Sequence, residues 1–259
     1  MARFEGLTAL LTGATGGYGT RLAQRLAEGG AHLVLSDLED TPLEALAARL
    51  DTQTAFLTGD ISDETVSERL VALAQSRFGG LDIAINNAGI AQSFVRFHLL
   101  PSDEARRVID VDLMGVYYAM KHQLPAMVRR TRQSDRGACA IVNVASVAGL
   151  AGAKRLAAYT AAKHGVVGLT RAAAAEYAAN RIRVNAICPS FSRTKMVTDY
   201  LKMSPAEPDK AEAGLTRDIP MKRLAEVEEV VEAILFAADP HNSFMTGQAL
   251  AIDGGITAI

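Results

Sequence analysis

"LTALLTGATGGYGTRLAQRLAEGG", residues 7–30, contains the sequence pattern that predicts the fold. Residues 7–12 are apolar at nearly every position, as in a strand that is buried on both faces of a sheet. Four glycines follow within residues 12–19, and the next residues place Leu22 and Leu26 four apart before a Gly-Gly pair. That spacing is typical of an amphipathic helix that ends in glycine. The stretch therefore predicts a strand, a tight turn and a helix in succession.

The same alternation continues along the chain. Six further segments are strand-length and apolar at nearly every residue: 32–36, 54–58, 82–86, 139–144, 182–188 and 248–252. Helical patterns lie between them, such as residues 62–78, which start with polar residues and stop at Gly-Gly. Strands that alternate with helices predict an α/β fold, a doubly wound parallel sheet of seven strands with helices on both faces. No linker or internal repeat divides residues 1–259, so we expect a single domain.

Composition and charge exclude several classes of function. The chain has 27 basic and 29 acidic residues, so its net charge of -2 gives no reason to expect a nucleic-acid partner. Its one basic cluster, in residues 129–136, is expected to be a solvated surface loop. The two cysteines lie in apolar runs and the five histidines show no ligand spacing, so we expect neither disulfides nor a metal. Without a signal-like start or an 18-residue apolar span, the chain is expected to be cytoplasmic, with no membrane contact.

The glycine-rich turn is a candidate phosphate cradle. Gly13, Gly17 and Gly19 come between a strand and a helix, where backbone amides and the helix N-terminus can approach a pyrophosphate without a Cβ in the way. Asp37 ends the second strand, where a carboxylate can accept hydrogen bonds from an adenosine ribose. The spacing is not G-x-G-x-x-G, so a tight turn without a ligand and a helix-capping role for Asp37 stay open as alternatives.

Several segments in order make the sequence resemble the short-chain dehydrogenase/reductase family over essentially its whole length. They are "TGATGGYG" (12–19), "NNAG" (86–89), Ser146, "YTAAK" (159–163) and "DGG" (253–255). The resemblance implies a Rossmann-like domain with Ser146, Tyr159 and Lys163 as catalytic residues.

The chemistry of these three residues agrees with that implication. Tyr159 and Lys163 are four residues apart and so share one helix face, where the ammonium favours the phenolate form of the tyrosine. In the family, this phenolate takes the proton of the substrate alcohol while a hydride passes to the nicotinamide, and the serine binds the substrate oxygen. Taken alone, a tyrosine and a lysine at this spacing would be an ordinary surface pair.

The resemblance also implies a set of cofactor contacts. By position they are Gly13, Thr15, Gly17, Tyr18 and Gly19 in the first turn, Asp37, Asp60 and Ile61, Asn87, Ala88 and Gly89, Pro189, Phe191 and Thr194, together with Tyr159 and Lys163. Asp37 would repel a 2'-phosphate, and Thr15, Gly16 and Leu38 offer no cation to bind one, so NAD is favoured over NADP. Asp60 alone would more often cap the helix at 62–78.

Two positions depart from the family pattern. Ser190 stands where the family commonly has glycine, which predicts a slightly different backbone in that loop. Asp112 stands where the family has the asparagine of its catalytic set. If the family residue acts through its backbone carbonyl, aspartate can substitute; if its side chain matters, the helix geometry or the Lys163 pKa changes. We expect an active enzyme whose pH profile differs from that of an Asp112→Asn variant.

The substrate is predicted less sharply. Residues 191–220 are expected to form a mobile lid with an apolar first half, or else a surface helix with a buried stripe. The expected pocket walls comprise Met196, Val197, Tyr200, Leu201 and Met203 on one side and Phe94, Val95, Phe97, Leu99, Leu150 and Leu156 on the other. They favour an apolar or cyclic secondary alcohol or its ketone. Arg96, His98, Lys154 and Arg155 could instead bind an anionic group.

The leading hypothesis is therefore an NAD-dependent alcohol dehydrogenase acting on a small-molecule alcohol or ketone. An NADPH-dependent carbonyl or 3-oxoacyl reductase is the alternative enzyme, and a catalytically weak NAD-binding sensor or scaffold is the alternative from another class. The family commonly forms tetramers through long helices, and the alanine-rich helix that starts near residue 156 is compatible with a homotetramer.

Overall fold

The strands form one parallel sheet. The computed structural model describes residues 2–133, 138–203 and 207–258, and in them seven strands are ordered β3-β2-β1-β4-β5-β6-β7. Their bounds are β1 Thr8–Thr12, β2 His32–Ser36, β3 Thr54–Phe56, β4 Ile83–Asn86, β5 Cys139–Val144, β6 Ile182–Pro189 and β7 Ala249–Ile252. The predicted seven-stranded parallel sheet is confirmed, with strand ends that differ by one or two residues.

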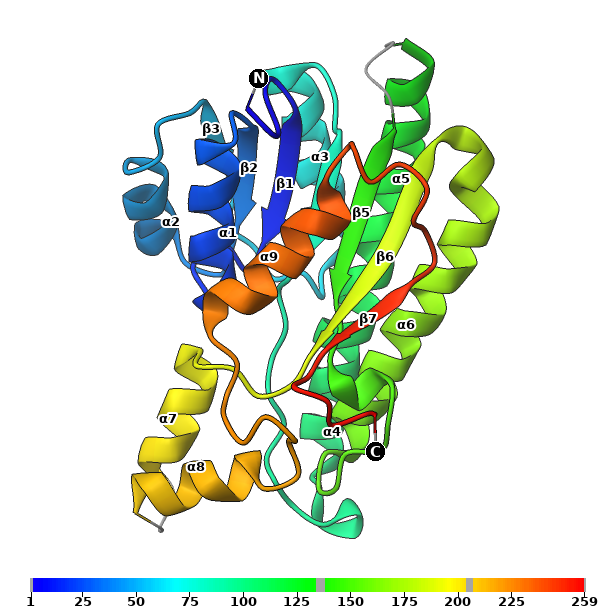
Figure 1. Ribbon diagram of the computed structural model, residues 1–259. Coiled ribbons are helices and arrows are strands. Elements are labelled where there is room, and N and C mark those ends of the chain that lie inside the picture. Colours follow the sequence, from blue (N-terminus) through cyan, green and yellow to red (C-terminus); the bar gives the residue numbers. More distant parts are fainter. Residues whose placement is uncertain (1, 134–137, 204–206, 259) are drawn as a thin grey trace.

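Helices cover both faces of the sheet (Figure 1). One apolar core joins the sheet to α1 (Gly17–Glu28), α2 (Asp40–Ala47) and α9 (Val227–Ala238). The other joins it to α3 (Glu64–Phe78), α5 (Gly115–Gln133) and α6 (Ala157–Tyr177), while α4 (Ser102–Ile109) packs on α6. None of the helices in the described part of the chain is long and apolar enough to cross a membrane.

The first turn requires glycine at two places. Gly13 has a φ of +65°, and a Cβ built on it would lie 2.8 Å from Ala88 Cα. A Cβ on Gly19 would lie 1.9 Å from the carbonyl oxygen of Gly13, which allows no side chain. This turn follows β1, which pairs with both β2 and β4, so it opens at the point where the strand order reverses. Ligands of doubly wound folds bind at that point, outside the carboxyl ends of the strands.

Residues 191–220, expected to form a mobile lid or a surface helix, include two helices. These are α7 (Lys195–Met203) and α8 (Pro208–Thr216), which extend from the carboxyl end of the sheet (Figure 1). The helical alternative agrees with the sequence, because apolar residues at 196, 197, 200 and 201 have helical spacing and Pro208 suits a first helical position. Closure of this segment as a lid stays a prediction. Arg193 holds α8 through a two-pronged ion pair with Glu212, at 2.7 and 3.1 Å. Residues 204–206 lie outside the described residues.

The basic cluster is not a loop over its first part. Arg129, Arg130 and Arg132 belong to the last turns of α5, and Arg136 lies outside the described residues. Arg130 reaches back to the largely buried Asp82, with nitrogen–oxygen distances of 2.7 and 3.0 Å. Asp82 in turn accepts a hydrogen bond from the Thr8 amide. The ion pair with Asp82, just before β4, therefore explains the position of Arg130.

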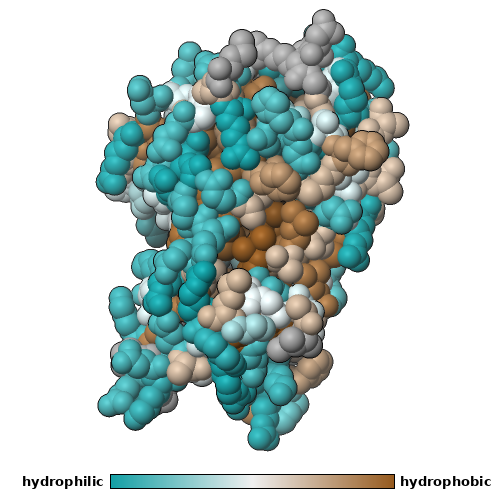
Figure 2. Space-filling view, viewed as in Figure 1, coloured by the Kyte–Doolittle hydropathy of each residue, from teal (hydrophilic) through white to brown (hydrophobic). Residues whose placement is uncertain are grey.

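The molecular surface carries an apolar area at the exposed edge of the sheet. Figure 2 shows hydrophobic residues gathered near the centre of the view, over the region of β6 and β7 in Figure 1. No residue of the edge strand β7 is fully buried. Phe236, on the neighbouring α9, is half exposed. Apolar edge strands of this kind usually meet a partner or a covering segment.

Candidate functional site

Lys163 is buried among three other groups at the carboxyl end of the sheet. Its Nζ lies 5.4 Å from the centre of the Tyr159 ring, one helical turn earlier in α6. It donates a hydrogen bond of 3.2 Å to the carbonyl oxygen of Val144, the last residue of β5. Its third neighbour is Asp112, whose Oδ2 is 3.3 Å from Nζ. The predicted pairing of Tyr159 with Lys163 is thus present in the structure, and Asp112 joins it.

Asp112 is completely buried, and its position depends on a local change of helix type. Residues Asp110–Met114 form a π-helical turn between α4 and α5, a feature that recurs at functional sites because it redirects side chains. Asp112 Oδ1 accepts a hydrogen bond of 2.8 Å from the Ile90 amide, whereas Oδ2 has no directed hydrogen bond and makes only the contact with Lys163. The carboxylate therefore faces the lysine rather than solvent.

This arrangement keeps Lys163 charged. Burial alone would lower the pKa of its ammonium, but the negative charge of Asp112 and the neighbouring Tyr159 outweigh burial and raise the pKa above the ordinary lysine value. The ion pair is the reason a cation can lie in this interior at all, because an unpaired buried ammonium would lose its proton or destabilise the fold.

Gly89 leaves the space that the pair occupies. A Cβ on this residue would lie 3.3 Å from Asp112 Oδ1 and 3.4 Å from Lys163 Nζ. The first distance is tighter than most real Cβ contacts and the second is at the limit of ordinary van der Waals contact, so a side chain here would require the carboxylate to shift by a few tenths of an ångström. The glycine of "NNAG" thus borders the charged pair.

Ser146 lies directly after β5, between the strand and a short 3-10 turn at Val147–Gly149. Its Oγ accepts a hydrogen bond of 3.1 Å from the Ala148 amide. Its own hydroxyl hydrogen reaches only the Pro189 carbonyl, at 3.5 Å. That is a long hydrogen bond, so the hydroxyl can turn to a better acceptor.

The first turn and the second strand are joined through Asp37. Its Oδ2 accepts hydrogen bonds from the Thr15 amide (2.8 Å) and the Thr15 hydroxyl (2.6 Å), and Oδ1 accepts one from the Leu38 amide (2.9 Å). A carboxylate has about four acceptor sites, so Oδ1 keeps one for a further donor. Asn87 and Ala88 close the other side, with both amides bonded to Thr12 Oγ1 and the Asn87 side chain bonded to the Gly13 carbonyl.

The first turn also touches the loop after β6. A Cβ on Gly17 would lie 2.8 Å from Thr194 Cβ, and the Tyr18 hydroxyl donates a 2.7 Å hydrogen bond to Ser192 Oγ. Burial raises the pKa of Tyr18 to about 12; the bond to Ser192 opposes this rise and Tyr159 adds to it. Ser192 was not among the expected site residues, because its partner is 174 residues away in the chain.

Three of the expected cofactor residues make contacts with neighbouring segments. Asp60 accepts hydrogen bonds from Ser62 and pairs with Arg107 at 2.7 Å, and it does not cap α3, since that cap is Asp63. Burial would raise the pKa of Asp60, but these hydrogen bonds and the arginine lower it overall. Ile61 packs on Gly115, and the Phe191 carbonyl accepts the Ala225 amide.

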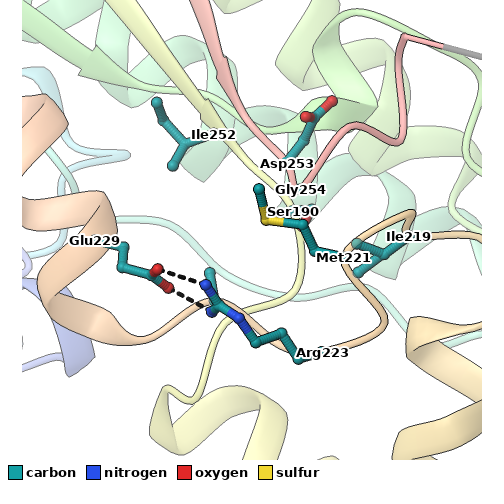
Figure 3. A pocket seen from close by; sticks show the side chains of 9 residues that line it. Ser190, Ile219, Met221, Arg223, Glu229, Ile252, Asp253 and Gly254 are labelled. Atoms are coloured by element: carbon teal, nitrogen blue, oxygen red, sulfur yellow. Dashed lines mark hydrogen bonds and ion pairs between the residues drawn. The ribbon is translucent and has the colours of Figure 1, made fainter.

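A separate cavity of about 250 Å³ lies beside the end of β7. It is lined by Ser190, Ile219, Met221, Arg223, Ala225, Glu229, Ile252, Asp253 and Gly254 (Figure 3). Arg223 and Glu229 face each other there at 2.7 Å, and this pairing, with the Glu226 amide, lowers the pKa of Glu229 to about 2. None of the residues expected to bind the cofactor or to form the apolar pocket walls lines it, but Ile219 belongs to the expected lid of residues 191–220, and Asp253 and Gly254 belong to "DGG".

Comparison with known proteins gives matches along the whole chain. Residues 13–257 match a family model described as enoyl-(acyl carrier protein) reductase. The cis-4-hydroxycyclohexanecarboxylate dehydrogenase of Sinomonas cyclohexanicum is 39% identical over 99% of this chain and 98% of its own. The cyclohexanol dehydrogenase of Acinetobacter sp. (strain SE19) is 36% identical, covering 99% and 97%. A crystal structure of levodione reductase, 35% identical, superposes with a TM-score of 0.92 over 99% of both chains.

The ion pair leads to a prediction for stability. Asp112→Ala leaves Lys163 buried without its counter-charge, so we expect the free energy of unfolding to fall by about 3 kcal/mol. Asp112→Asn, which keeps an acceptor for the Ile90 amide, should lose less. Because the pKa of Lys163 is raised, the stabilisation is complete at pH values below the ordinary lysine pKa and is lost only above the raised value.

Urea denaturation at pH 6 and pH 8 tests this expectation. The loss of unfolding free energy in Asp112→Ala should be equal at the two pH values. The control is Asp103→Ala, which removes an exposed acid from the first turn of α4. An Asp112→Ala protein as stable as this control would show that the ion pair does not hold Lys163 in place.

Proposed function

The chain belongs to the short-chain dehydrogenase/reductase family, and from this premise we propose that it oxidises a secondary alcohol on a six-membered carbon ring, with NAD as hydride acceptor and Tyr159 as general base. The observation that carries the proposal is the contact of Lys163 with the Tyr159 ring, 5.4 Å from nitrogen to ring centre, in a buried setting. A fixed ammonium beside a phenol favours the phenolate, which is the form that can accept a proton.

Each residue of the proposed site has a separate task. Tyr159 takes the hydroxyl proton of the alcohol, and the electron pair of that bond forms the carbonyl of the product. Ser146 donates its hydroxyl hydrogen to the same oxygen, replacing its long bond to Pro189. Lys163 keeps its proton throughout, because Asp112 compensates its charge. NAD, when bound, supplies the acceptor for the hydride that leaves the carbinol carbon.

The residues of the first turn fit this cofactor. A Cβ on Gly13, Gly17 or Gly19 would meet Ala88, Thr194 or the Gly13 carbonyl, so glycine keeps this turn compact at the N-terminus of α1, where backbone amides can approach a pyrophosphate. Asp37 has an acceptor site left for a ribose hydroxyl and would repel a 2'-phosphate. These features support NAD as the cofactor and the other expected contacts, from Asp60 to Thr194, as its binding residues.

The substrate class rests on relatives and on exposed apolar side chains. Two similar enzymes are named for alcohols of a cyclohexane ring. In this chain Phe97 and Leu99, after β4, are 81% and 60% exposed, which leaves apolar area for a ring to cover. We propose that residues 191–220 close over this ring, with Arg193 as the tether of α8. The side chains of Met196, Tyr200 and Met203 lie outside the described residues.

The same residues can work in the reverse direction, as the name levodione reductase indicates for one relative. Tyr159 would then return its proton to the carbonyl oxygen. Oxidation stays our leading proposal, because both relatives named for the cyclohexane ring are called dehydrogenases.

We also propose that the active form is a homotetramer. Four of the exposed residues on α6 are small, namely Ala161, Gly168, Ala172 and Ala175, which permits another helix to approach closely. The apolar area at β7 offers a second contact surface (Figure 2).

Steady-state kinetics tests the function. We expect the protein to reduce NAD when supplied with cyclohexanol or with cis- or trans-4-hydroxycyclohexanecarboxylate. Tyr159→Phe should lower kcat about a hundredfold or more while NAD still binds. The control is Tyr177→Phe, the same change on the same helix, which should keep full activity. Activity retained in Tyr159→Phe would overturn the role of the phenol. A wild-type protein that binds NAD but oxidises none of these alcohols would overturn the substrate class.

A second prediction concerns the choice of cofactor. Asp37→Ala removes the charge that would repel a 2'-phosphate, so the ratio of kcat/KM with NADP to that with NAD should rise at least about tenfold, or ~1.4 kcal/mol. We compare the ratio because Asp37 also bonds to Thr15, and the loss of this bond will lower kcat/KM with both cofactors. The exposed neighbour Glu39, changed to alanine, is the control and should leave the ratio unchanged. An unchanged ratio in Asp37→Ala would contradict this role.

A further inference from the structure

The segment after β4 contacts each part of the proposed site in turn. Asn87 and Ala88 bond to the first turn through Thr12, the Ile90 amide bonds to Asp112, and Gln92 bonds to Tyr159. Beyond it, the Ser93 amide bonds to Glu104 of α4 at 2.6 Å. One short stretch of backbone therefore fixes where the carboxylate and the tyrosine lie relative to each other.

Gln92 is a buried polar residue whose side-chain amide is fully engaged. It is 3% exposed. Its Oε1 accepts a hydrogen bond of 3.0 Å from the Tyr159 backbone amide, and its Nε2 donates to the carbonyl oxygens of Arg155 (3.2 Å) and Ser93 (3.3 Å). A buried side chain that bonds three separate backbone groups is costly to replace, because each group would lose its partner away from water.

The amide that Gln92 binds is one that the helix itself cannot satisfy. Tyr159 is the third residue of α6, and the first N–H groups of a helix have no partner within it. The residue before the helix, Leu156, has no side-chain oxygen to cap it. Gln92, 67 residues earlier in the chain, supplies that acceptor.

The other end of Gln92 holds the turn that leads into α6. Arg155 has a φ of +67°, a conformation that residues other than glycine rarely adopt. The bond from Gln92 Nε2 to the Arg155 carbonyl is a contact that retains this conformation. The Gln92 side chain thus bonds one residue just before α6, Arg155, and one residue inside the helix, Tyr159, and so determines where the helix begins.

We propose that Gln92 is a positioning residue that holds the backbone of Tyr159 at a fixed place relative to Asp112 and Lys163. The proposal rests on the proposed function, in which Tyr159 is the base. Ile90 and Gln92 lie two residues apart, one bonded to the carboxylate and one to the tyrosine, so the segment sets the separation between them. Loss of the Gln92 bonds should let the start of α6 shift, and displacements of about 1 Å can cost about a hundredfold in rate.

The test is Gln92→Met, which keeps the length of the side chain and removes its hydrogen bonds. We expect kcat to fall roughly tenfold to a hundredfold, with the KM for NAD within about twofold of wild type. Hydrogen exchange of the cofactor-free protein should be at least about tenfold faster at residues 157–163 and unchanged in α3. The control is Asp63→Ala, which removes the cap of α3 and should speed exchange there without changing kcat.

Exchange needs no turnover, so it separates this proposal from the proposed function. If the wild type oxidises none of the alcohols, the function fails, while faster exchange at the start of α6 still supports the role of Gln92. If Gln92→Met does not fold, Gln92→Asn serves instead, because its amide is one methylene too short to keep all three bonds. The proposal is overturned if the Gln92→Met protein exchanges its amides at residues 157–163 at the wild-type rate. It is also overturned if the kcat of Gln92→Met equals that of Asp63→Ala.

Discussion

The contact on which the rest of the site depends is the buried ion pair between Lys163 and Asp112. An ammonium with 4% exposure is stable only with a counter-charge and hydrogen-bond acceptors around it. Here the counter-charge comes from the π-helical turn before α5, an acceptor comes from the end of β5, and the Tyr159 ring lies beside the charge. The positive charge beside the tyrosine ring is held in place by this arrangement.

The fold supplies these partners because parallel strands end at one edge. β1, β4, β5 and β6 deliver, in that order, the glycine turn, the 87–93 segment, Ser146 and the loop of residues 190–194. Hydrogen bonds join these pieces, such as the bond from the Tyr18 hydroxyl to the Ser192 hydroxyl and the bond from the Tyr159 amide to the Gln92 side chain. Gly89, which has no side chain, leaves room beside this scaffold for the charged pair. The site is therefore built from loops, but loops that are fixed to one another.

The sequence predicted the sheet and the pairing of Tyr159 with Lys163, because buried strands and residues four apart leave a direct signal in the order of residues. It left open whether the Asp112 side chain acts on the lysine, since the contact between them depends on a π-helical turn with no clear signature in the sequence. Gln92 and Ser192 were missed because their partners are distant in the chain. For residues 191–220 the sequence left a mobile lid and a surface helix open, because the apolar spacing of α7 is followed by a polar stretch.

The pH–rate profile of wild type and Asp112→Asn, measured with the same alcohol and saturating NAD, is the most direct test of this account. Asparagine removes the negative charge that keeps the buried Lys163 protonated and so changes the charge beside the phenol. We predict that the kcat/KM profile of Asp112→Asn is displaced along the pH axis from that of the wild type. Superimposable profiles, with both proteins folded and active, would contradict the claim that the Asp112–Lys163 pair controls the charge at the site.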